Sequence, residues 1–287
     1  MAYGVQSQNQ QSLKPVSRTQ NKNQYDTFYF TDFIAAQITT IDGGVFSTVT
    51  STGTVSTNPT DGITGFGITG CHGTVRLNTS ATSSQSAAAA VTVGYNNASY
   101  NLLCGIQSPS SSALVSKYEI ETLIRTGPII FDGTTSGGFF RIGFLDSILN
   151  SSLNRGVYFE RLANGTTNDT TFWVTVLSLS NGSERTNTSV TFSTNTTYRL
   201  YLSLEAFTGG TYTITYKIKN MTTGTNTEGT ITPTTNRVPT ATTDNMAGIV
   251  VVGKTAITST TDVQLHVDYM GMRIRKPISR EILLGTL

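Results

Sequence analysis

The stretch that decides the fold is TYRLYLSLEAF, residues 197–207, in which apolar and polar side chains alternate. Successive side chains of a β-strand point to opposite sides, so this segment is expected to be a strand with one buried face. The apolar face carries Tyr198, Leu200, Leu202 and Leu204, and the polar face carries Arg199, Tyr201, Ser203 and Glu205.

A second segment, TYTITYKIKN at residues 211–220, repeats this alternation. Its expected inward set is Tyr212, Ile214, Tyr216 and Ile218, and its outward set is Thr213, Thr215, Lys217 and Lys219. Similar short segments follow one another from Lys117 to Arg275, separated by Gly, Asn, Thr or Ser, with no convincing amphipathic helix between them. This pattern predicts an all-β fold in which two antiparallel sheets pack face to face as a sandwich.

Length and composition favour one sandwich domain between two terminal segments. A chain of 287 residues can bury a large core, and sandwiches of this size commonly form a single domain. Residues 1–25 are rich in Gln, Asn and Ser and are expected to form an extended arm. We assign residues 26–275 to the sandwich. Residues 276–287 form a tail whose apolar side chains need a partner surface.

Charge and the N-terminal sequence exclude several classes of function. Only 13% of the residues are charged and the net charge is +2, so nothing predicts binding to nucleic acid. The N-terminus lacks the apolar run of a secretory signal, and no segment is apolar enough to span a bilayer. The chain is therefore expected to fold in a cytoplasm, where free thiols at Cys71 and Cys104 are favoured over a disulfide.

Two carboxylates in the segment KYEIETLIR are the candidates for catalysis. Glu119 and Glu121 lie two residues apart and so share a face, which is the minimum that glycoside cleavage requires. Nothing nearby would keep one carboxyl protonated, and the strand lacks the aromatic residues of a sugar cleft. We interpret the pair as facing solvent and matched with Lys117 or Arg125. The chain is therefore expected not to be an enzyme, and no catalytic residue or cofactor is assigned.

Possible metal ligands are equally sparse. Cys71 lies next to His72 but lacks a second ligand pair at usable spacing for zinc. Asp132, Asp146 and Asp169 lie in or beside loops, where oxygen ligands can hold a calcium ion, but they show no recognisable ligand spacing. No metal site is assigned.

Aromatic residues in loops suggest where a glycan could bind. Tyr95, Tyr100 and Phe131 lie in or near predicted loops and would offer aromatic faces to a sugar, so they are the predicted glycan-binding residues. The single tryptophan, Trp173, lies inside the predicted strand TFWVTVLSLS, where its expected role is core packing.

Four segments carry a resemblance to a known family: GITGFGITGCHGTVRLNTS, YEIETLIRTG, FFRIGFLDS followed by GVYFERL, and LHVDYMGMRI. In this order they resemble the concanavalin-like jelly rolls of tailed-bacteriophage structural proteins, over about residues 26–275. The resemblance implies a non-enzymatic virion component, often trimeric, on the head as a decoration or cement protein or on the tail as a fibre or adhesin. No binding residues carry over, because the family has no shared motif.

Two functional hypotheses follow from the sequence. The first is a head decoration protein, assembled in the host cytoplasm into the virion. Its arm and tail would hold it to a major capsid protein or tail protein, and it would be a homo-oligomer, with a trimer implied by the resemblance. The alternative is a tail fibre or receptor-binding adhesin that recognises a host surface glycan.

Overall fold

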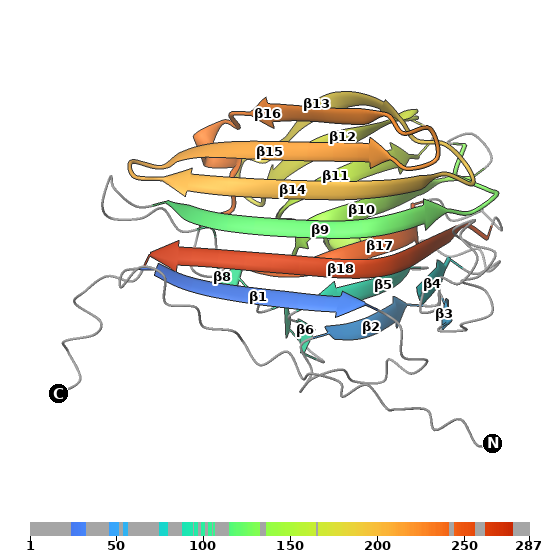
Figure 1. The fold of residues 1–287 in the computed structure, drawn as a ribbon, viewed down its shortest axis with the longest axis horizontal. Helices are drawn as coiled ribbons and strands as arrows, with labels where there is room; N and C mark the ends of the chain where they lie inside the picture. Colours follow the sequence, from blue (N-terminus) through green and yellow to red (C-terminus); the bar gives the residue numbers. More distant parts are fainter. Residues whose placement is uncertain are drawn as a thin grey trace, which may run out of the picture.

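The computed structural model describes residues 24–32, 46–51, 54–56, 75–79, 88–93, 95–96, 99–100, 103–104, 106, 115–132, 136–164, 166–240, 244–255 and 262–277. Within these ranges the chain forms two eight-stranded antiparallel sheets that pack face to face (Figure 1). The predicted two-sheet sandwich is therefore confirmed. Its strands run from Gln24 to Pro277, slightly beyond both predicted ends. The rest of the predicted arm and tail lies outside the described residues.

Sheet A is the nearer layer in Figure 1, with the strand order β16-β15-β14-β9-β18-β4-β3. The bounds of its strands are β16 (Asn226–Ile231), β15 (Thr211–Asn220), β14 (Thr197–Phe207), β9 (Ser116–Thr126), β18 (Gln264–Pro277), β4 (Val75–Asn78) and β3 (Thr54–Ser56). The eighth strand, β1 (Gln24–Asp32), pairs with the C-terminal part of β18, and β4 pairs with its N-terminal part. The first and last strands of the sandwich, β1 and β18, are therefore neighbours in sheet A.

Sheet B forms the second layer, with the order β13-β12-β11-β10-β17-β5-β2. Its strands are β13 (Gly182–Thr191), β12 (Thr171–Ser178), β11 (Gly156–Ala163), β10 (Gly138–Leu145), β17 (Asn245–Lys254), β5 (Ala88–Val93) and β2 (Phe46–Ser51), with β8 (Leu103–Cys104) paired to β17. A hairpin of β6 (Tyr95–Asn96) and β7 (Ser99–Tyr100) and two short 3-10 helices, η1 (Asn150–Ser152) and η2 (Thr235–Arg237), complete the described elements.

The main core lies between the two sheets and follows the predicted alternation. All four apolar side chains predicted to face inward from β14 are buried, and so are the four predicted for β15. Aromatic rings from both sheets meet here: the Phe172 ring of β12 makes edge contacts with Phe192 at 4.9 Å and Tyr198 at 5.1 Å between centroids. Such pairs stabilise a core beyond the area they bury.

The central strands of sheet B are buried on both faces. A second apolar cluster on the outer side of this sheet includes Ala90, Phe139, Tyr158 and Val251. This double burial explains the almost continuous apolar sequence of β5, β10 and β17, which contrasts with the alternating burial of β9 and β15 in sheet A. Sheet A is therefore the layer whose outer face is polar.

Trp173 does not pack in the main core, so the predicted role of this residue was wrong. Its neighbours Phe172 and Val174 point into the core, and the strand alternation turns Trp173 to the outer face of sheet B. There the Arg185 guanidinium lies 4.7 Å from the centroid of the indole ring. The Trp173 ring therefore makes a cation–π contact and not the core packing that its apolar sequence neighbours predict.

The Tyr198 hydroxyl provides a test of the core. Its ring is fully buried, and its hydroxyl donates to the Thr191 carbonyl at 2.9 Å and accepts from the Ser193 amide at 2.9 Å. Tyr198→Phe keeps the ring but removes both hydrogen bonds to the backbone. We therefore expect the free energy of unfolding to fall by about 1–2 kcal/mol in urea titrations. Tyr201→Phe, on the outer face, is the control, and an equal loss in both variants would contradict this account.

Candidate functional site

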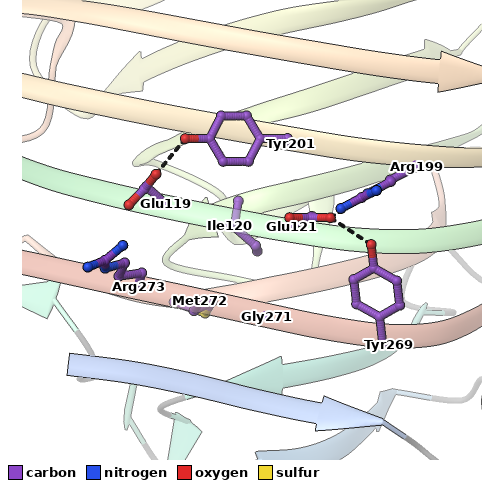
Figure 2. Close-up of a pocket in the computed structure, with 9 residues that line it drawn as sticks. All are labelled: Glu119, Ile120, Glu121, Arg199, Tyr201, Tyr269, Gly271, Met272 and Arg273. Carbon is purple, nitrogen blue, oxygen red and sulfur yellow. Dashed lines mark hydrogen bonds and ion pairs between the residues drawn. The ribbon is translucent and has the colours of Figure 1, made fainter. Parts of the chain in front are cut away.

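A hollow of about 530 Å³ lies on the outer face of sheet A, over β14, β9 and β18 (Figure 2). Its charged and aromatic lining residues are Glu119, Glu121, Arg199, Tyr201, Tyr269 and Arg273. These six side chains come from three strands that are far apart in the sequence, so only the sheet brings them together.

The hollow exists because β18 carries a glycine at the middle of its outer face. Met270 and Met272 are buried in the core, so strand alternation turns position 271 outward. Gly271 is the direct partner of Glu121 on β9. Because glycine has no side chain, β18 contributes only backbone to the lining of the hollow between Tyr269 and Arg273.

Strand register aligns the site in three rows across β14, β9 and β18. The rows are Arg199, Leu123 and Tyr269; Tyr201, Glu121 and Gly271; and Ser203, Glu119 and Arg273. Directly opposed side chains on one face of a sheet lie about 4.5–5.5 Å apart at Cβ. Diagonal neighbours in adjacent rows lie farther apart but within reach of long side chains, so Tyr201 and Arg199 on β14 and Tyr269 on β18 can reach the β9 carboxylates.

The two carboxylates are held by similar sets of partners. Glu119 accepts a hydrogen bond from the Tyr201 hydroxyl at 2.5 Å and pairs with the Lys117 ammonium at 3.3 Å. Glu121 accepts from the Tyr269 hydroxyl at 2.7 Å and pairs with Arg199 Nε at 2.5 Å. Each carboxylate thus has one hydroxyl and one cation.

The two tyrosines keep their protons. Burial, with the hydrogen bond to Glu119, raises the pKa of the Tyr201 hydroxyl, and burial with the hydrogen bond to Glu121 raises the pKa of Tyr269. Both hydroxyls therefore act as hydrogen-bond donors at neutral pH. Figure 2 shows both rings face-on, on opposite sides of the β9 carboxylates, and both side chains are half-buried.

A second hollow of about 370 Å³ continues the first toward the β16 edge of the sheet. It shares Glu121, Arg199 and Tyr201 with the first hollow and adds Lys217 and Lys219 of β15. Asn226 of β16 completes its polar lining. The two hollows together run across five neighbouring strands, from β18 to β16.

The residues predicted to bind a glycan lie elsewhere and are not brought together at this hollow. The Tyr95 and Tyr100 backbones pair with each other in the β6–β7 hairpin, and their role in glycan binding stays a prediction. Phe131 is fully buried in the main core, against Phe140 at 6.0 Å between ring centroids. Its ring therefore offers no face to a sugar, because the segment after β9 folds inward rather than forming an open loop.

The carboxylate pair was recognised from the sequence, but its surroundings were not. The pairing of Glu119 with Lys117 is confirmed, whereas Arg199 of β14 takes the place predicted for Arg125. Arg125 lies further along β9, in register with His266. The one aromatic residue of KYEIETLIR, Tyr118, is buried in the main core, and the aromatic groups of the hollow come from the neighbouring strands, as Tyr201 and Tyr269. The outward position of Tyr201 in the alternating pattern was the one available signal.

The aspartates considered for calcium have other partners. Asp146 pairs with Arg155 at 3.3 Å, and Asp169 pairs with Arg185 at 2.5 Å. Within the described ranges no group of three or more His, Cys, Asp or Glu side chains is placed to hold a metal ion. Cys71 and His72 lie outside those ranges.

The architecture is identified by comparison with solved structures. No protein-family model and no curated protein sequence matches this chain significantly. Among solved structures, peanut lectin in complex with a nine-residue peptide is 9% identical, with a TM-score of 0.52, and the match covers 88% of this chain and 99% of the lectin. The chain has the concanavalin-like jelly-roll fold. The phage origin implied by the sequence resemblance gains no support from these matches.

The same fold carries more than one activity. Lectin I from Ulex europaeus, in complex with the methyl glycoside of α-L-fucose, is 11% identical, with a TM-score of 0.51, and the match covers 88% of this chain and 98% of the lectin. The PL-14 alginate lyase from Aplysia kurodai is also 11% identical, with a TM-score of 0.50, and the match covers 87% and 98%. At these identities the likeness establishes the fold, and the fold is compatible with binding and with turnover.

A membrane-crossing helix is not part of the described structure: none of its helices is long and apolar enough to span a bilayer.

Proposed function

We propose that this chain binds carbohydrate in the hollow around Gly271, without turning it over. The observation that carries the proposal is the placement of two half-buried tyrosine rings, Tyr201 and Tyr269, face-on beside the carboxylates of Glu119 and Glu121 (Figure 2). The lectin-like fold supports the proposal, because the Ulex europaeus lectin solved with a fucoside shares this architecture.

A sugar ring presents apolar C–H faces and a rim of hydroxyls, and the hollow offers groups for both. The electron-rich face of a tyrosine ring attracts the weakly positive C–H groups of a sugar. Glu119 and Glu121 accept hydrogen bonds from sugar hydroxyls, and charged acceptors make stronger hydrogen bonds than neutral ones. Because each carboxylate is already held by a hydroxyl and a cation, little side-chain entropy is lost on binding.

The similarity of the two carboxylates favours binding over cleavage. Glycoside cleavage needs one carboxyl that is protonated and one that is ionised, which requires different surroundings. Glu119 and Glu121 instead have one tyrosine hydroxyl and one cation each. A tyrosine acting as a general base would need a lowered pKa, whereas the pKa of Tyr201 and of Tyr269 is raised.

Tyr201→Ala tests the proposal on a glycan array and by isothermal titration calorimetry. We expect the wild-type protein to bind at least one saccharide and the variant to bind it about tenfold more weakly, since a stacking face worth about 1.4 kcal/mol is lost. Tyr201→Phe keeps the ring and loses only the hydroxyl, so it should bind with intermediate affinity. An array without hits, or equal binding by all three proteins, would refute the proposal. Turnover of a polysaccharide that disappears in Glu119→Gln would instead establish an enzyme.

Of the two roles suggested by the resemblance, the proposal favours the glycan-recognising adhesin, because a polar hollow on an outer face serves recognition of a surface glycan. The head decoration role depends on segments 1–25 and 276–287, which lie almost wholly outside the described residues. That role, the virion location, the capsid or tail partner and the trimer stay predictions.

A further inference from the structure

We infer that the saccharide is acidic, with a carboxylate or sulfate group that binds at the β15 end of the paired hollows; this inference rests on the proposed function. The observation behind it is the second hollow, which adds Lys217 and Lys219 to a lining shared with the first. Binding sites for acidic groups in proteins are commonly built from arginine and lysine side chains.

The lining of the two hollows is unbalanced in charge. It contains four cations, Arg199, Lys217, Lys219 and Arg273, against the two carboxylates Glu119 and Glu121. The chain as a whole is nearly neutral, with a net charge of +2, so this excess is a local property of the outer face of sheet A. The excess is concentrated on the β14–β15 side, where the second hollow lies.

The two lysines are available to a ligand. Lys217 pairs with Glu228 at 3.2 Å, but both side chains are more than half exposed, and such surface pairs contribute little to stability. Among the described residues no carboxylate lies within ion-pair distance of Lys219, which is exposed. Both ammonium groups can therefore pair with an acidic ligand at little cost to the fold.

Register places the lysines one strand beyond the aromatic part of the site. Lys217 is the direct partner of Tyr201, and Lys219 is the direct partner of Arg199. Neighbouring strands lie about 4.8 Å apart, which is close to the length of one sugar unit. A sugar stacked on Tyr201 would thus place the acidic group of the same or the next unit over Lys217 and Lys219.

The accompanying groups favour a saccharide over another polyanion. Nucleic acid is held mainly by many phosphate contacts along a basic surface, whereas here the basic lining is short and adjoins Glu119 and Glu121. Those carboxylates would repel phosphates but accept hydrogen bonds from sugar hydroxyls. At one end of the site, carboxylates accept hydrogen bonds from sugar hydroxyls, and at the other end ammonium groups bind an acidic group. This combination matches an acidic sugar.

The test compares neutral, uronic-acid and sulfated oligosaccharides of equal length by titration calorimetry, with a single-stranded DNA oligonucleotide as a polyanion control. We expect the wild-type protein to bind one acidic class at least about tenfold more tightly than the neutral oligosaccharide and the DNA. Lys217→Gln with Lys219→Gln should remove this preference, so that acidic and neutral oligosaccharides bind with similar affinity. Lys217→Arg with Lys219→Arg, which keeps both charges, should retain most of it.

The outcomes separate this inference from the function on which it rests. Binding of neutral oligosaccharides alone would overturn the acidic preference and leave the carbohydrate-binding function intact. Failure to bind any oligosaccharide would overturn both. Equal binding of acidic saccharide and DNA, or an acidic preference that survives the double glutamine variant, would show that the β15 lysines do not select the ligand.

Discussion

Gly271→Val is expected to abolish saccharide binding while leaving the sandwich folded. The hollow depends on the missing side chain at this position, which lies between Tyr269 and Arg273 and opposite Glu121. A valine there would fill the floor of the site and separate a sugar from the carboxylates. Since valine is favoured in strands, the substitution should not weaken β18 by itself. We expect affinity to fall at least about 100-fold, or about 2.8 kcal/mol.

Thr213→Val is the matched control for this prediction. It places valine on the outer face of the same sheet, on β15, at a position that lines neither hollow. Titration calorimetry should give wild-type affinity for this variant, and thermal unfolding should show that both variants are folded. Undiminished binding by a folded Gly271→Val protein would mean that the saccharide binds elsewhere, for example near the β6–β7 hairpin.

Gly143→Ala is expected to remove most of the stability of the fold. Gly143 lies in β10, in the middle of sheet B, with a φ of +158°. A Cβ atom at this position would lie 2.4 Å from the Val157 carbonyl oxygen and 2.5 Å from the Tyr158 Cα atom of β11. Both contacts are with backbone in a paired strand, which cannot move without breaking the ladder. Overpacking and backbone strain together should cost about 4 kcal/mol or more.

Gly210→Ala separates the cost of the clash from the cost of the backbone conformation. Gly210 has a φ of +75°, and the nearest atom to its added Cβ would be Thr235 Cγ2 at 3.7 Å. This variant should lose only about 1–2 kcal/mol. Urea unfolding followed by circular dichroism would measure both losses, and similar values for the two variants would contradict the steric explanation.

The alternating segments of sheet A could be predicted well because their two faces meet different surroundings. The inward and outward sets of β14 and β15 are as expected. Trp173 was misplaced because it lies in a run of three consecutive apolar residues, Phe172 to Val174, in which no alternation marks the outward face. In sheet B, burial of both faces removes the contrast on which the period-two pattern depends.

The candidate site could be predicted only in part. Glu119 and Glu121 share a face because they are two residues apart on one strand, and this follows from local geometry. Their hydroxyl partners do not: Tyr201 is 82 residues from Glu119, and Tyr269 is 148 residues from Glu121. Phe131 was expected in an open loop because no local pattern shows that a segment rich in glycine will fold against the core.

The class of fold and the inward and outward residues of β14 and β15 could be predicted from the sequence, because side-chain alternation is a property of a single strand. Only the tertiary structure shows that β9 lies between β14 and β18, and that Gly271 lies opposite Glu121. Strand order and register depend on contacts between distant segments, and no local pattern encodes them. The hollow, its tyrosine rings and its lysine-lined end are therefore products of strand pairing.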